Sequence, residues 1–170
     1  MATDLADLAR RLQRLEDLEA VRSTWLDYCS RLDAQNFAAL GDVFTEDAEV
    51  EMVGLARSLD GTYRGRRSII EDFYVRTEAA SPGAGPALQT GHLSTNMQIE
   101  LKGDEATTLA YFFEIVDDNL VLIGTYQHRM RRDGDRWRIG RLRISVRFRA
   151  RLEANQLRGR SLEEILARPI

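Results

Sequence analysis

The chain has 170 residues, the length of a single domain with one hydrophobic core. Hydrophobic residues make up 44% and charged residues 30% of the sequence, which excludes a disordered chain and a membrane protein. The net charge of -3 argues against a nucleic-acid-binding domain, because such domains are normally basic.

The single cysteine, Cys29, has no partner for an internal disulfide. No signal segment precedes the first helical pattern, so we expect a cytoplasmic protein. The apolar run at residues 120–123 is far too short to cross a bilayer.

A long amphipathic helix is predicted for residues 4–32, because apolar residues recur there at spacings of three and four. Its early turns are rich in charged residues and are a candidate for contact with a partner subunit. Residues 33–36 break the helix, and Asn36 can cap a short helix over residues 37–43.

Strand and helix signals alternate in the next segment. Residues 49–53 alternate as a first strand, and residues 61–65 form a turn-rich hairpin or short strand. Ser68 is expected to cap a helix that carries the apolar residues from 69 to 75. The Gly- and Pro-rich residues 79–86 are predicted to form a loop that could close a pocket.

The remainder of the chain predicts a meander of long strands joined by short turns, followed by a tail with a short helix capped at Ser161. The four strands are expected at residues 92–101, 106–116, 120–132 and 136–149.

The last of these strands changes its alternation, which predicts a bulge near Gly140 and a sheet that curls. Trp137 and Ile139 share one side before the change. The apolar residues expected together after it are Leu142, Ile144, Val146 and Phe148. The arginines expected on the opposite, solvated or subunit-facing side are Arg141, Arg143, Arg147 and Arg149.

The candidate chemistry lies in Tyr28, Asp33 and His92. A carboxylate beside an imidazole makes a proton-transfer pair, because it fixes the tautomer of the ring and stabilises the imidazolium. A nearby phenol could donate to a leaving or developing oxygen. From the residues alone, Asp33 is equally a turn residue and Tyr28 equally a packed aromatic.

Further pocket candidates are predicted from helix and strand periodicity. Trp25 lies on the apolar stripe with Tyr28, and His128 shares strand alternation with Tyr126. Asn96 shares a face with His92 in a regular strand. The substrate-binding candidates are therefore Trp25, Asn96, Tyr126 and His128.

We expect no cofactor. The two histidines, His92 and His128, are far apart in sequence and belong to no His or Cys pattern that binds metal. No Gly-rich phosphate loop follows a strand, so the sequence does not indicate a nucleotide cofactor.

The order of these elements resembles a known fold family. The similarity spans residues 8–150 and includes residues 40–48, 61–65, 92–96 and 133–137. The chain resembles the SnoaL-like domains of the NTF2-like superfamily. The resemblance implies an α+β cone, in which N-terminal helices pack on the concave face of a curved, mostly antiparallel sheet. Residues 1–150 would form this domain, and residues 151–170 a C-terminal tail.

The placement of Asp33 and His92 resembles the branch with scytalone dehydratase, bacterial bile-acid dehydratase and hexachlorocyclohexane dehydrochlorinase. The resemblance implies that His92, held by Asp33, removes a proton in an elimination, and that Tyr28 protonates the departing hydroxyl. The late-strand arginine of the dehydrochlorinase falls near Leu142, a departure that argues against chloride expulsion.

The sequence therefore predicts a cofactor-independent lyase of the dehydratase type that acts on a small, apolar, cyclic substrate. A SnoaL-like cyclase or isomerase with the same acid-base residues is the first alternative, and a non-catalytic small-molecule-binding module is the second. The resemblance also implies a homo-oligomer, a dimer or a trimer. No nucleic-acid or membrane partner is expected.

Overall fold

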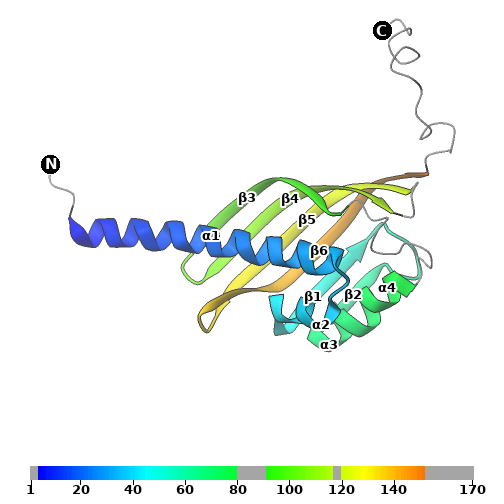
Figure 1. Ribbon diagram of the computed structural model, residues 1–170, viewed down its shortest axis with the longest axis horizontal. Helices are drawn as coiled ribbons and strands as arrows, with labels where there is room; N and C mark the ends of the chain where they lie inside the picture. Colours follow the sequence, from blue (N-terminus) through cyan, green and yellow to red (C-terminus); the bar gives the residue numbers. More distant parts are fainter. Residues whose placement is uncertain (1–3, 80–90, 117–119, 152–170) are drawn as a thin grey trace, which may run out of the picture.

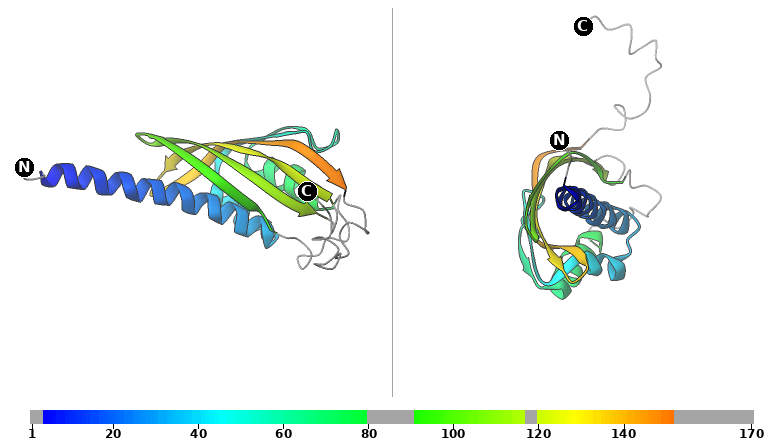
Figure 2. Two further views of the ribbon diagram at one scale, coloured as in Figure 1. Left: turned by 90° about the horizontal axis from the view of Figure 1, so that it is seen from above. Right: turned by 90° about the vertical axis from the view of Figure 1, so that its left-hand side faces the viewer.

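The computed structural model describes residues 4–79, 91–116 and 120–151. A six-stranded sheet curls around one long helix, α1 (Leu5–Asp33), as the end-on view in Figure 2 shows. The order of the strands is β2-β1-β6-β5-β4-β3 (Figure 1). The predicted α+β class, with a helix on the concave face of a curved sheet, is confirmed.

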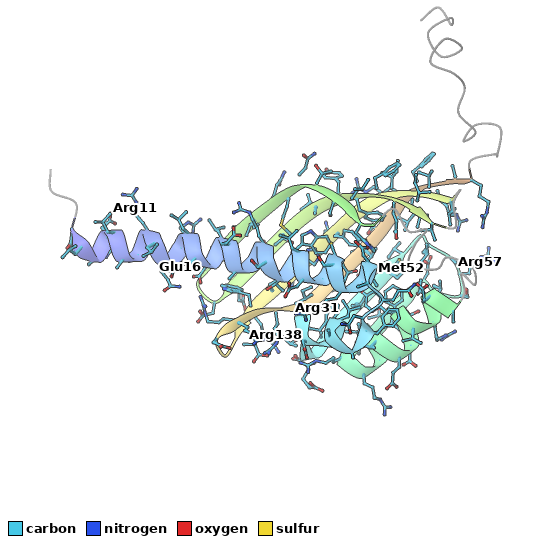
Figure 3. All side chains as sticks on the ribbon, in the orientation of Figure 1. Arg11, Glu16, Arg31, Met52, Arg57 and Arg138 are labelled. Atoms are coloured by element: carbon cyan, nitrogen blue, oxygen red, sulfur yellow. The ribbon has the colours of Figure 1, made fainter. Side chains whose placement is uncertain are left out.

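Helix α1 begins where the sequence predicts, because the Asp4 carboxylate accepts a hydrogen bond from the backbone N–H of Ala6. The first turns of α1 extend beyond the sheet (Figure 1), and Figure 3 shows Arg11 and Glu16 on this projecting part. The second half of the helix packs on the concave face of the sheet. The residues that it buries there are Val21, Trp25, Tyr28 and Cys29.

A short helical segment turns the chain from α1 to the sheet. The Asn36 side chain accepts a hydrogen bond from the backbone N–H of Ala39 and caps α2 (Phe37–Leu40), as predicted. A 3₁₀ turn, η1 (Gly41–Val43), follows directly. Together they cover the range that the sequence assigned to one helix.

The second helical run consists of α3 (Arg66–Ser68), the π-helical η2 (Ile69–Tyr74) and α4 (Val75–Ala79). The predicted cap at Ser68 is wrong, because the run begins after Gly65, which has a φ of 81°. The Ser68 hydroxyl instead donates to the Asp72 carboxylate at 2.7 Å. The π turn buries the adjacent aromatic rings of η2 against the core.

Neighbouring strands of the sheet are antiparallel, except for β1 and β6. β1 pairs with β2 on one side and runs parallel to β6 on the other. The predicted meander of four strands is confirmed, each with slightly shifted ends. The strands are β1 (Phe44–Val53), β2 (Gly61–Arg64), β3 (Leu93–Lys102), β4 (Glu105–Val116), β5 (Leu120–Asp133) and β6 (Arg136–Arg151).

Two bulges bend β6. The predicted one at Gly140 is confirmed, because Ile139 and Arg141 pair with consecutive residues of β5. A second bulge lies at Arg147, where the same register shift recurs. The expected positions of Phe148 and Arg149 are therefore wrong. Phe148 is 51% exposed, and Arg149 lies at the cavity described below.

The arginines before the second bulge lie on the outer side of the sheet, as predicted. Arg141 contacts the carboxylates of Glu49 and Glu51 at 3.3 and 3.4 Å, and Arg143 contacts Glu51 at 3.5 Å. Acidic side chains of β1 thus balance the charges of these arginines.

The core lies between α1, the η2 helix and the concave face of the sheet. Its fully buried side chains include Tyr28, Leu40, Phe44, Ile69, Phe73, Met130, Ile139 and Leu142. Within the described parts of the chain, no helix has both the length and the apolar character needed to cross a membrane. The predicted loop at 79–86, beyond Ala79, and the predicted helix of the tail lie outside the described residues.

Candidate active site

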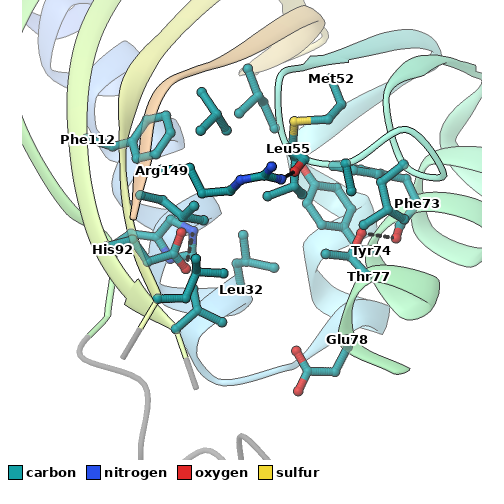
Figure 4. Close-up of a pocket in the computed structure, with 18 of the residues that line it drawn as sticks. Leu32, Met52, Leu55, Phe73, Tyr74, Thr77, Glu78, His92, Phe112 and Arg149 are labelled. Atoms are coloured by element: carbon teal, nitrogen blue, oxygen red, sulfur yellow. Dashed lines mark hydrogen bonds and ion pairs between the residues drawn. The ribbon is translucent and has the colours of Figure 1, made fainter. Parts of the chain in front are cut away.

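A cavity of about 330 Å³ opens between the end of α1, the helical run and the concave face of the sheet (Figure 4). Ligand pockets in proteins occupy roughly 300–1,000 Å³, so this one suits a small molecule. Most of its lining is apolar, with Leu32, Met52, Phe73 and Phe112 among the contributors. Its polar groups include Tyr28, Tyr74, His92, Glu114, Tyr126 and Arg149.

The end of α1 and the start of β3 bring Asp33 and His92 together. The Nδ1 atom of His92 lies 2.5 Å from the Asp33 Oδ1 atom, and the backbone N–H of His92 donates to both carboxylate oxygens at 3.2 Å. Gly91 permits this approach, because its φ is 77° and a Cβ there would lie 3.1 Å from the Asp33 Oδ2 atom.

The two groups shift each other's pKa in the directions of an ion pair. Burial alone would lower the pKa of His92, but the hydrogen bond that its ring donates to Asp33 and the charge of Glu114 raise it above its usual value. Burial would raise the pKa of Asp33, yet the hydrogen bonds from His92 lower it. Asp33 therefore stays ionised and fixes the proton of the neutral ring on Nδ1, which leaves Nε2 as the basic atom.

Glu114 lies on the side of the imidazole ring opposite to Asp33. The sequence analysis did not predict it as a site residue. Its Oε1 atom is 3.8 Å from the Nε2 atom of His92, and burial raises its pKa. The sequence does contain a signal for it. Glu114 shares strand alternation with the buried residues Ala110 and Phe112, which places its carboxyl group on the apolar face of the sheet.

Tyr28 also lines the cavity, and its ring centroid lies 6.5 Å from that of His92. Its hydroxyl accepts a hydrogen bond from the Tyr74 hydroxyl at 2.9 Å. Burial raises the pKa of Tyr28 well above its usual value, so the phenol stays protonated. Such a group is suited to donating a hydrogen bond and is a weak source of protons.

Of the expected substrate-binding aromatics, Tyr126 lines the cavity and Trp25 lies behind it. The Trp25 ring stacks on the Tyr28 ring, with 4.9 Å between the ring centroids, and its centroid lies 4.5 Å from that of the His128 ring. Trp25 therefore supports the wall of the cavity and is not among its lining residues.

His128 and Asn96 lie apart from the cavity. His128 is buried, contacts the Thr108 hydroxyl at 2.5 Å, and has a pKa lowered by burial to about 3, so it is neutral near pH 7. Asn96 is exposed, has a φ of 55°, and sits in a register shift between Thr95 and Gln98. The expected common face of Asn96 and His92 is wrong because of this irregularity.

Arg149 reaches the cavity through the second bulge of β6. Its guanidinium donates a hydrogen bond to the carbonyl of Leu55, which lies in the segment between β1 and β2. Figure 4 shows the side chain of Arg149 extending from β6 toward Leu55. No cluster of three His, Cys, Asp or Glu side chains that could hold a metal ion occurs in residues 4–79, 91–116 and 120–151.

The sequence profile of the SnoaL-like domain matches residues 13–143, so the chain belongs to the SnoaL-like family. A comparison with curated proteins finds no significant match. An NTF2-like protein with a cystatin-like fold from Novosphingobium aromaticivorans has a similar structure, with 25% identity, a TM-score of 0.68, and 99% of each chain covered.

Two further similar structures have lower identity and show a similar fold. A provisionally assigned scytalone dehydratase from Novosphingobium aromaticivorans is 17% identical, with a TM-score of 0.63 and with 83% of this chain and 91% of that chain covered. A hexachlorocyclohexane dehydrochlorinase from Novosphingobium barchaimii is 16% identical, with a TM-score of 0.66 and coverage of 85% and 95%.

Proposed function

We propose that the protein is a cofactor-independent lyase of the dehydratase type, acting on a small, largely apolar, cyclic β-hydroxy carbonyl compound. One observation carries this proposal. His92 lines an apolar cavity, and the Asp33 carboxylate holds its Nδ1 atom. Two of the similar structures are described as a provisionally assigned scytalone dehydratase and a dehydrochlorinase, which supports an elimination.

In the proposed reaction, the Nε2 atom of His92 removes the proton from the carbon next to the carbonyl group. Asp33 orients the ring and stabilises the imidazolium that forms. The Tyr28 hydroxyl, itself fixed by Tyr74, donates a hydrogen bond to the oxygen on which negative charge develops. The C–O bond of the β-hydroxyl then breaks toward oxygen, which takes a proton from an acid of the site and leaves as water.

The experiment that tests this function is incubation with a panel of cyclic β-hydroxy ketones, followed by mass spectrometry. Elimination removes one water from the substrate and forms a conjugated enone. A product of unchanged mass would instead point to the isomerase or cyclase. Saturable binding with no change in any ligand of the panel would contradict catalysis.

The rate should depend on pH through His92. Its folded-state pKa lies above the usual 6.5, and the base must be neutral, so the rate of α-proton removal should rise as the pH increases through that raised value. The protonated ring stabilises the folded state, and this stability is lost over the same rise. Kinetics and thermal unfolding across this range measure both trends. A rate of α-proton removal that is flat through the titration of His92 would contradict its role as the base.

We also propose that copies of the chain associate through the outer face of the sheet. Leu93, Phe113, Ile123 and Phe148 are paired in register across four neighbouring strands and are 55%, 36%, 39% and 51% exposed. They form an unbroken apolar row on this face, and such a row favours burial against a second copy.

This association predicts that Ile123→Glu, in the middle of the row, lowers the mass of the particle to that of the single 19.4 kDa chain. Light scattering after gel filtration measures the mass. Gln127→Glu is the matched control, because it adds the same charge at an exposed position of the same strand. A wild-type protein that is already monomeric would contradict the association.

A further inference from the structure

The carboxyl group of Glu114 occupies the side of His92 that the elimination uses. Its Oε1 atom is 3.8 Å from Nε2, the atom that would remove the proton from carbon, and both residues line the cavity. The pairing of β3 with β4 explains this neighbourhood. The two strands are antiparallel, and Leu93 is opposite Phe113. His92, which precedes Leu93, is therefore next to Glu114, which follows Phe113.

The site places two carboxyl groups around one imidazole ring. Asp33 is the more exposed of the two and is held as a carboxylate by its bonds to His92. An ionised Glu114 would put a second negative charge in a buried apolar pocket, where only one imidazolium could balance the pair. Burial and the charges of Asp33 and Glu78 raise the pKa of Glu114, while His92 opposes this shift. Glu114 therefore holds a proton more readily than an exposed glutamate does.

Resting on the elimination proposed above, we propose that Glu114 is a further catalytic residue, the acid that protonates the departing hydroxyl group. In this proposal Glu114 takes the role that the family resemblance implies for Tyr28. Loss of a proton from Tyr28 would leave a phenolate fully buried among aromatic rings, and burial raises its pKa well above 10. A carboxylic acid in the same cavity is the much stronger acid.

The protons balance within the pair. His92 takes the proton from carbon, and the electrons of the C–H bond form the new C=C bond. The C–O bond breaks toward oxygen, which takes the proton of Glu114 and leaves as water. The imidazolium and carboxylate that remain are neighbours, so one proton transfer from Nε2 to the Glu114 carboxylate restores both groups. The formation of the imidazolium also makes Glu114 a better acid, because positive charge at His92 lowers the pKa of Glu114.

Two probes separate the two acid-base roles. Cyclohexanone in D₂O reports removal of the α-proton alone, because it has no leaving group. β-Hydroxycyclohexanone reports the complete elimination, because it releases water and forms an enone that absorbs in the ultraviolet. Glu114→Gln retains the size and polarity of the side chain and removes the acidic proton.

We expect Glu114→Gln to lose much less of the cyclohexanone exchange than of the elimination, because only the elimination needs the proton of Glu114. Circular dichroism and thermal unfolding show that the variant is folded. Its elimination of β-hydroxycyclohexanone should fall about 10²-fold or more, a typical loss for a missing general acid. Tyr28→Phe is the matched comparison. It should slow both reactions to a similar extent, because its hydrogen bond to the carbonyl oxygen serves both.

The outcomes distinguish the two proposals. Equal elimination by Glu114→Gln and the wild type would overturn the role of Glu114 and leave the role of His92 intact. A selective loss of elimination in Tyr28→Phe would assign the acid to the phenol instead. A wild-type protein that catalyses neither reaction would contradict the proposed function, and the role of Glu114 with it.

Discussion

Replacement of His92 by alanine is expected to lower kcat/KM for elimination by about 10²- to 10⁴-fold, the usual contribution of a general base. The loss should appear equally in the α-proton exchange of cyclohexanone, because both reactions begin with the same proton transfer. Asp33→Asn should cost less, about 10- to 100-fold. The amide can still accept from Nδ1–H, but it no longer stabilises the imidazolium with a full charge.

Ser94→Ala is the control for these variants, because Ser94 lies two residues beyond His92 on β3 and outside the cavity lining. It should retain wild-type rates. Circular dichroism and thermal unfolding establish that each variant is folded. If His92→Ala kept more than about a tenth of the wild-type rate on both probes, the base would have to be another group.

The largest effect on stability is expected at Gly124 of β5. A Cβ atom there would lie 2.1 Å from the carbonyl oxygen of Ser145 and 2.6 Å from the Phe112 ring. The first of these atoms belongs to the backbone of β6, so the strands would have to separate. We expect Gly124→Ala to destabilise the fold by about 3 kcal/mol, or roughly 6–12 °C in Tm.

Gly140→Ala is the matched control on the neighbouring strand. Its Cβ would lie 3.6 Å from the carbonyl oxygen of Arg129 and 3.8 Å from the Thr45 hydroxyl, which are ordinary contacts. Urea and thermal denaturation should therefore place Gly140→Ala within about 1 kcal/mol of the wild type. Similar stability of the two alanine variants would show that β5 and β6 do not pack as closely as the structure describes.

The sequence predicted the elements of this fold well because periodicity is a local property. Helix α1 carries its apolar stripe in its own sequence, and the change of alternation around Gly140 marks a bulge without any knowledge of the neighbouring strand. The proximity of Asp33 and His92 was predicted from the family resemblance together with their residue types. Their separation of 59 positions gives no local signal.

What the sequence did not predict depends on the register between strands. The bulge at Arg147 exists because of how β6 pairs with β5, and it brings Arg149 to the cavity against the expected alternation. The irregularity at Asn96 likewise depends on β4. Glu114 differs from these, because its alternation with buried residues was visible. Its place beside His92 follows only from the pairing of β3 and β4.

The most direct test of the central claim is the crystal structure of the protein with β-hydroxycyclohexanone or its enone product bound. The Nε2 atom of His92 is the proposed base. The ring of the ligand should therefore lie in the cavity, with the carbon next to its carbonyl group about 3–3.5 Å from Nε2. The carbonyl oxygen should face the Tyr28 hydroxyl. A ligand bound elsewhere on the molecule, or one in the cavity whose reactive carbon faces away from His92, would contradict the account.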